Sequence, residues 1–185
     1  MKKIFMMAVM AVAALTASAQ NAEGQVTLMP KAGINISSIT NIDNAKSKVG
    51  FVGGVEAEYG LPSNFAVSAG ILFSMQGAKS KVNDNNVKLN YLNIPILCNY
   101  YVWKGLAVKA GVQPGFRLSA KVNDDDIKNR VKSFDFSIPV GVSYEYQKFV
   151  LDARYNIGVT KANDDGNDSE RNSVFAITLG YKFAL

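Results

Sequence analysis

Apolar and polar residues alternate one by one through much of this chain, and the pattern is clear in the stretch GLAVKAGVQPGFRLS at residues 105–119. In this stretch Leu106 and Val108 occupy one phase, while Lys109 and Gln113 occupy the other. Such alternation places successive side chains on opposite faces, as in a β-strand with one apolar and one polar face. The pattern recurs and predicts eight strands, at residues 25–38, 50–59, 65–77, 88–102, 105–120, 133–146, 149–160 and 173–183.

The connections between the predicted strands are short and long in turn. The short ones are turns such as LPSN, WK and QK, and the long ones are polar segments such as KVNDDDIKNRVK and KANDDGNDSERN. Antiparallel strands joined in this order form an up-and-down meander. No helical period competes with the strand pattern, so the sequence predicts one all-β domain.

The two faces of the predicted strands differ in charge and in bulk. The bulky apolar face carries no charged residue, as in the run Phe134, Phe136, Ile138, Val140 and Val142. The opposite face is rich in glycine, serine and charged residues. An eight-stranded barrel has barely enough interior room for its own side chains, so the small face fits inside. A charge facing lipid at the membrane midplane costs about 2–4 kcal/mol, which explains why the bulky face has none. We therefore predict an eight-stranded antiparallel up-and-down transmembrane β-barrel.

Ten charged residues on the inward face form a candidate lumenal charge network. They are Lys31, Glu56, Glu58, Lys109, Arg117, Asp135, Glu145, Asp152, Arg154 and Lys182. Five are basic and five are acidic, so their charges balance. Because charges removed from bulk water require partners, we interpret the set as a plug of paired charges. The alternative is an ion-selective pore, which would need a wider lumen and one dominant sign of charge.

Aromatic residues gather beside the short turns and at the C-terminus, where they predict an aromatic girdle at the membrane interface. The girdle residues are Tyr59, Phe65, Tyr100, Trp103, Tyr144, Tyr146, Phe149, Tyr181 and Phe183. Within the predicted strands, Pro95 and Pro139 each remove a backbone donor, and we expect a β-bulge at each.

The first residues, MKKIFMMAVMAVAALTASAQ, have the three parts of a secretory signal peptide. Lys2 and Lys3 form the basic region, an apolar run follows to Leu15, and Ala17 and Ala19 frame a small-residue cleavage site. The apolar run is too short for a transmembrane helix. We expect residues 1–19 to be removed and residues 20–185 to form the barrel domain.

The signal peptide, the strand YLNIPILCNYY, the alternation punctuated by glycine and the terminal LGYKFAL are together similar to one known family. This is the porin-like outer-membrane β-barrel domain family of Gram-negative bacteria, which includes small OmpA/OmpX-like barrels. The resemblance covers essentially the whole mature chain. It implies a location in outer-membrane lipid and recognition of the aromatic-ended last strand by the barrel-assembly machinery. Ala184 and Leu185 follow Phe183 and depart from that ending.

The composition argues against catalysis and cofactor binding. The chain has no histidine and a single cysteine, Cys98. It therefore lacks the commonest general base and cannot form a thiolate metal cluster. The aspartate-rich connections do not match the ligand spacing of a calcium loop. Basic residues are scattered among acidic ones, which argues against nucleic-acid binding. We expect no enzyme activity, no cofactor, no metal site and a monomer.

The function expected from this reading is structural or adhesive. A rigid barrel in the outer membrane would present four extracellular loops to an unidentified surface ligand, because loops on a rigid scaffold often carry binding residues. The alternative is a narrow porin-like channel for small solutes.

Overall fold

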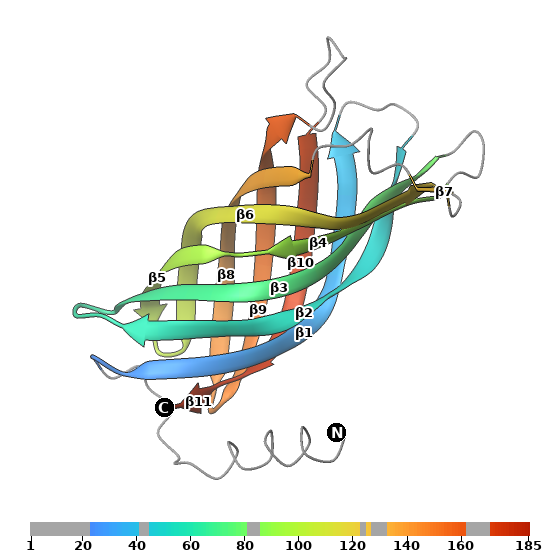
Figure 1. The fold of residues 1–185 in the computed structure, drawn as a ribbon. Helices are drawn as coiled ribbons and strands as arrows, with labels where there is room; N and C mark the ends of the chain where they lie inside the picture. Colours follow the sequence, from blue (N-terminus) through green and yellow to red (C-terminus); the bar gives the residue numbers. More distant parts are fainter. Residues whose placement is uncertain (1–22, 41–44, 81–85, 123–124, 127–132, 162–170) are drawn as a thin grey trace, which may run out of the picture.

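The computed structural model describes residues 23–40, 45–80, 86–122, 125–126, 133–161 and 171–185. Within these ranges every helix or strand assigned is a β-strand, and the strands form one antiparallel sheet (Figure 1). None of the described residues belongs to a helix long and apolar enough to cross a bilayer. The strands are β1 (Val26–Thr40), β2 (Ala45–Gly60), β3 (Phe65–Ser80), β4 (Asn86–Asn93), β5 (Ile96–Trp103), β6 (Leu106–Val122), β7 (Asp125–Asp126), β8 (Phe134–Tyr146), β9 (Phe149–Lys161), β10 (Arg171–Tyr181) and β11 (Phe183–Ala184).

The sheet closes on itself because β1 pairs with β2 on one side and with β10 on the other. Strands β4 and β5 continue each other alongside β6, and β10 and β11 do so alongside β1. The two-residue β7 pairs only with the tip of β6. With each continuing pair counted once and β7 left out, the described residues form eight barrel strands in chain order. The predicted fold class is confirmed, and each predicted strand overlaps an observed one.

The two ends of the barrel differ in their connections. At the short-turn end, tight turns join β2 to β3, β5 to β6 and β8 to β9, and the chain enters and leaves the barrel there (Figure 1). Each of these turns contains a residue with positive φ: Ser63 and Asn64 in the first, Gly105 in the second and Gln147 in the third. At the opposite end, which we call the long-loop end, lie the end of β1 and the start of β2, the end of β3 and the start of β4, the end of β6 and the start of β8, and the end of β9 and the start of β10.

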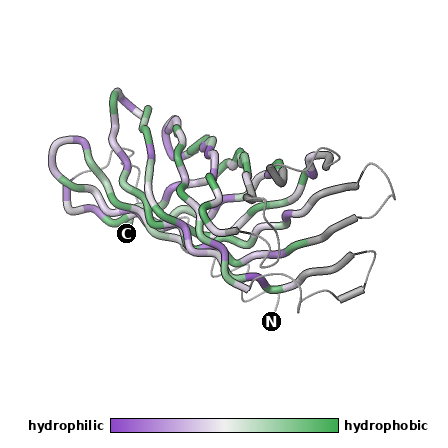
Figure 2. The backbone as a smooth tube through the Cα atoms, turned by 90° about the horizontal axis from the view of Figure 1, so that it is seen from above, coloured by the Kyte–Doolittle hydropathy of each residue, from purple (hydrophilic) through white to green (hydrophobic). Residues whose placement is uncertain are grey.

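Buried and exposed side chains alternate along the strands. Hydrophilic and hydrophobic residues alternate along the same strands, as the backbone coloured by hydropathy shows (Figure 2). Large apolar side chains point outward, for example Ile71 at 58 % exposure and Leu151 at 53 %. Charged side chains of the opposite phase are buried, including Glu56 at 1 % and Arg154 at 4 %. The apolar face is therefore outside, as the interior volume of a small barrel requires.

The expected bulges at the two prolines are wrong. Around Pro95, Asn93 lies opposite Leu72 and Ile96 lies opposite Ala69, so neither strand has gained a residue. Pro139 lies in unbroken register opposite Asn156. Between β4, which ends at Asn93, and β5, which begins at Ile96, the strand is interrupted because Pro95 has no N–H to donate. The Pro95 carbonyl still accepts a hydrogen bond from Gly70 N at 3.0 Å.

Irregularities occur at other positions. The register shifts between Ser47 and Val52 where β2 pairs with β3, and between Asn90 and Tyr91 where β4 pairs with β6. Each shift changes which residues share a face of the sheet beyond that point, because side chains alternate with a period of two.

Glycine makes space for the interior charges at one position in particular. Gly141 lies opposite Arg154, and a Cβ at Gly141 would lie 3.0 Å from Arg154 Cγ and 2.4 Å from Ala153 O. A larger residue there would displace either the guanidinium stem or the neighbouring strand.

Candidate functional site

The centre of the lumen holds five charged side chains, which we call the central cluster: Lys31 on β1, Glu56 on β2, Lys109 on β6, and Asp152 and Arg154 on β9. The five side chains are each no more than 5 % exposed. They reach the same volume because every one occupies the inward phase of its strand.

Arg154 joins the two carboxylates of the central cluster. Its Nη2 donates to Asp152 Oδ2 at 2.7 Å and to Glu56 Oε2 at 2.8 Å. Lys31 Nζ lies 3.2 Å from Glu56 Oε2 and 3.4 Å from Asp152 Oδ2. Lys109 Nζ lies 3.2 Å from Asp152 Oδ2 and 3.9 Å from Glu56 Oε1. Each carboxylate therefore meets three cations, which link four strands across the lumen.

A second group, which we call the turn-end cluster, lies nearer the short turns: Glu58, Asn99, Tyr101, Glu145 and Lys182. Lys182 Nζ donates to Glu145 Oε2 at 2.7 Å and to Glu58 Oε1 at 2.9 Å. Tyr101 Oη and Asn99 Nδ2 each donate to Glu58 at 2.7 Å. Glu58 is thus held by three donors, two of them on β5 and the third, Lys182, between β10 and β11, so that hydrogen bonds as well as charge satisfy it.

Eight of the ten residues predicted for the charge network fall into these two clusters. The other two, Arg117 and Asp135, are half-buried and lie toward the long-loop end. Arg117 Nη2 lies 3.4 Å from Ser133 Oγ, and Thr160 Oγ1 donates to Asp135 Oδ1 at 2.7 Å. The charge count missed Asn99 and Tyr101, although their inward phase and polar atoms could have indicated them.

Side chains fill much of the remaining lumen. Met29 and Leu97 are 1 % exposed, and Tyr91 is 5 % exposed. A cavity of about 20 Å³ adjoins the central cluster, with Asn35, Thr178 and Arg154 among its lining residues. That volume has room for about one water molecule.

The residues predicted for the aromatic girdle lie around the short-turn end. Seven of the nine are at least 40 % exposed, while Tyr181 and Phe183 are half-buried. Tyr181 packs between Phe149, at a ring-centroid distance of 5.2 Å, and Phe183, at 4.7 Å. Their role at a membrane interface remains a prediction.

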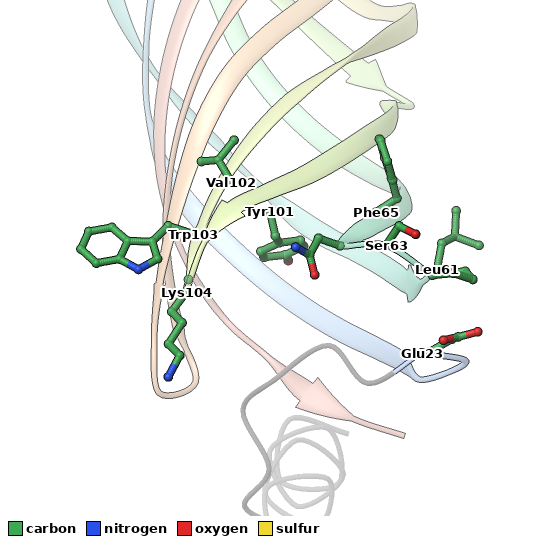
Figure 3. Close-up of a pocket in the computed structure, with 11 residues that line it drawn as sticks. Glu23, Leu61, Ser63, Phe65, Tyr101, Val102, Trp103 and Lys104 are labelled. Carbon is green, nitrogen blue, oxygen red and sulfur yellow. The ribbon is translucent and has the colours of Figure 1, made fainter.

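A groove of about 590 Å³ lies at the short-turn end, between the turn that precedes β3 and the turn that follows β5. Figure 3 shows Trp103 and Lys104 on one side of Tyr101, pointing away from it. Leu61 and Glu23 lie on the opposite side of Tyr101. The groove is open and its walls are turn residues of mixed polarity.

Among the described residues, no three His, Cys, Asp or Glu side chains come together in a way that could hold a metal ion. Cys98 is exposed on the outer, apolar face.

Comparison with known proteins assigns the chain to a family. A family model described as outer membrane protein beta-barrel domain matches residues 18–164. The chain belongs to that family. As an outer membrane protein beta-barrel domain, it lies in the outer membrane of a Gram-negative bacterium, as the sequence predicted. No match is found among curated protein sequences.

Solved structures of small outer-membrane barrels have the same fold. One is Ail, the attachment invasion locus protein of Yersinia pestis, in complex with the heparin analogue sucrose octasulfate. The two sequences are 16 % identical, the alignment covers 88 % of this chain and 100 % of that chain, and the TM-score is 0.54. Another is Neisserial surface protein A, which is 17 % identical to this chain. The alignment covers 87 % of this chain and 99 % of that chain, and the TM-score is 0.52. These similarities support the barrel fold of this outer membrane protein beta-barrel domain.

Proposed function

We propose that this protein is a closed outer-membrane anchor whose long polar connections bind a partner at the cell surface. The observation that carries the proposal is the central cluster, in which three cations meet Glu56 and Asp152 across the lumen. A lumen blocked by paired charges leaves the outer end of the barrel as the place for binding. Binding residues commonly lie on loops held by a rigid scaffold.

The orientation of the anchor follows from the lengths of its connections. Outer-membrane barrels have short periplasmic turns and longer extracellular loops. The short-turn end, with both ends of the described barrel, therefore faces the periplasm. The connections that contain residues 41–44, 81–85, 123–132 and 162–170 face the cell exterior.

A sulfated glycan is a reasonable first probe for the loops. Ail, which has the same fold, is solved with a heparin analogue bound. Among the long connections, residues 123–132 contain Lys128, Arg130 and Lys132, which can supply positive charge to a sulfated sugar, whereas the charged residues of 162–170 are all acidic.

The closed lumen is tested by conductance. Purified, refolded protein in a planar bilayer should give no stable single-channel steps, because paired side chains occupy the lumen. A steady, ion-selective conductance from the monomer would overturn the plug and favour the narrow channel for small solutes.

The binding role is tested separately on whole cells. In one variant residues 162–170, and in a second residues 123–132, are replaced by Gly-Ser segments of equal length. Cells producing the wild type should adhere to a heparin-coated surface, and the variant of residues 123–132, which loses three basic residues, should adhere less at an equal amount of folded barrel. The variant of residues 162–170 loses only acidic charges and serves as the control. Equal adhesion of all three cell lines, or none above cells without the protein, would contradict an adhesive role toward this glycan.

A further inference from the structure

Polar side-chain atoms without a hydrogen-bond partner gather around one space in the lumen. Within the described part of the chain, six buried side-chain nitrogen or oxygen atoms have no partner. Five of them belong to Asn35, Arg154, Asn156 and Thr178, which all line the cavity of about 20 Å³ beside the central cluster. We call this space the lumenal cavity. Because buried polar atoms are usually hydrogen-bonded, so many of them around one cavity indicate a bound ligand.

Arg154 contributes most of the available donors. A guanidinium has five N–H groups, and the two on Nη2 face Glu56 and Asp152. The remaining three, one on Nε and two on Nη1, meet no acceptor among the described residues. Since Arg154 is buried and a buried donor without an acceptor destabilises the fold, these three N–H groups require an acceptor from outside the barrel wall.

Two neutral side chains add donors to the same cavity. Thr178 is buried opposite Asp152 on the neighbouring strand, and its hydroxyl has no partner among the described residues. Asn156 can turn its amide and present the NH₂ group in place of the unpartnered Oδ1. Asn35 keeps its Oδ1 as an acceptor, because its Nδ2 already donates to Ser74 Oγ at 2.8 Å. Donors therefore outnumber acceptors in this group of atoms.

The charges around the lumenal cavity are also unequal in number. Two cations, Lys31 and Arg154, line it together with one carboxylate, that of Asp152. The central cluster as a whole likewise has three cations and two carboxylates. Because buried charges need partners, an anion satisfies this wall better than a neutral water molecule does.

The turn-end cluster does not supply that negative charge to the cavity, although it has two carboxylates and one lysine. Along β2, Val52 lines the cavity, Glu56 follows in the central cluster, and Glu58 comes after it toward the short turns. The central cluster therefore lies between the lumenal cavity and the turn-end carboxylates. The excess of cations at the cavity wall is left for a ligand to offset.

The volume of the cavity restricts the ligand to a small anion. A volume of about 20 Å³ is enough for one water molecule. Sulfate, phosphate and organic carboxylates consist of several atoms and do not fit, whereas a halide ion is a single atom.

We infer that the lumenal cavity binds one halide ion, which is chloride in ordinary salt solutions. Arg154 holds the ion through charge-assisted hydrogen bonds from Nε and Nη1, and the Thr178 hydroxyl donates to it from the next strand. The ion joins β9 to β10 and offsets the excess of positive charge in the cavity wall. This site goes beyond the proposed surface role, and it requires neither a partner for the loops nor their location outside the cell.

Bromide tests the site directly, because it replaces chloride and scatters X-rays anomalously. Crystals of the refolded protein soaked in sodium bromide should show an anomalous difference peak in the lumenal cavity, beside Arg154 and Thr178. A wild-type cavity without such a peak would overturn the inference and assign the space to water.

Urea unfolding in uncharged detergent tests the same ion in solution. Sodium chloride is exchanged for sodium gluconate at constant ionic strength, because gluconate is too large for the cavity. The wild-type midpoint should rise with chloride, since a ligand of the folded state stabilises it. In Thr178→Val, which removes one donor at nearly constant size, the rise should begin at about tenfold higher chloride.

Thr27→Val is the matched control. Thr27 is 4 % exposed and Thr178 is 5 % exposed, but the hydroxyl of Thr27 donates to Glu58 O, away from the cavity. The control should respond to chloride like the wild type, and gel migration of unheated and heated samples verifies that each variant is folded.

Two results in solution would also overturn the inference. One is an equal wild-type midpoint in chloride and in gluconate, and the other is the same chloride dependence in Thr178→Val and Thr27→Val. If Thr178→Val does not fold, the bromide peak and the comparison of chloride with gluconate decide. Neither measurement involves a surface partner or a current through the lumen, so failure here is distinct from failure of the adhesion or conductance experiments.

Discussion

Asp152 shows how much a single interior residue contributes to this barrel. Its carboxylate is 2 % exposed and lies within 3.4 Å of Lys31, Lys109 and Arg154. Removing one partner of a buried ion pair is costly because the remaining charges stay out of water without compensation. Arg117 differs, since it is half-buried and close to the long-loop end.

The substitution Asp152→Asn should lower the free energy of unfolding by about 3–5 kcal/mol, because three buried cations would then share one carboxylate. Urea unfolding in detergent micelles measures the change, with fluorescence of Trp103, the one tryptophan of the chain, as the probe. Asp125→Asn, on the two-residue β7, serves as the matched control. An equal loss of stability in the two variants would contradict the importance of the central cluster.

Arg117→Gln should cost less than Arg154→Gln in the same assay. Arg154 is 4 % exposed and donates to two carboxylates, whereas the guanidinium of Arg117 retains access to solvent. If the two substitutions prove equally destabilising, burial is not what determines the contribution of a charge in this lumen.

At the scale of the strand, the lipid-facing and lumenal faces differ in whether they can accommodate a charge. On β8, Val140 is 38 % exposed on the outer face, and Ser143 is 4 % exposed in the lumen opposite Asp152. Lipid cannot pair with a charge, but a lumenal carboxylate can. The effect of a new charge therefore depends on the phase of its position.

Val140→Arg should destabilise the barrel by about 2–4 kcal/mol or prevent its assembly, because the guanidinium would face hydrocarbon. Ser143→Arg should be milder, since the new charge lies beside Asp152. The fraction of protein that becomes folded in lipid vesicles measures both effects, and Val140→Leu controls for size. Equal folding of the two arginine variants would reverse the assignment of the faces.

Pro95 allows a test at one of the two places where a described barrel strand is interrupted, the other being between β10 and β11. The carbonyl of Pro95 accepts from Gly70 N, and an alanine in its place would direct an N–H toward Gly70 O on the opposing residue. The new hydrogen bond in Pro95→Ala should therefore raise the free energy of unfolding by about 0.5–1.5 kcal/mol. Loss of the proline reduces this gain slightly, because proline restricts the unfolded chain and alanine does not. A clear loss of stability would show that the interruption itself supports the barrel.

At the scale of the whole molecule, the sequence predicted the architecture well and the network only in part. Alternation is a local property, so the strands and their inward charges could be found without knowing which strands are neighbours. Register is not local. The extra residue that β2 contains between Ser47 and Val52, for example, is recognised only from the pairing of β2 with β3.

The predicted signal peptide leads to a prediction for the mature chain. If cleavage follows Ala19, protein extracted from outer membranes should begin at Gln20. Intact-mass spectrometry distinguishes this product from the full chain. Retention of Met1 to Ala19 in the membrane-extracted protein would contradict it.

Lys182 lies close to the end of the chain, whereas Glu58 and Glu145, to which it donates, belong to β2 and β8. When the last strand is not paired with β1, both carboxylates lack the positive charge of Lys182. Neutralisation coincides with the pairing of the last strand against β1, because both need the same few residues in place. Electrostatic attraction therefore favours closure of the sheet, in addition to the backbone hydrogen bonds of the last strand.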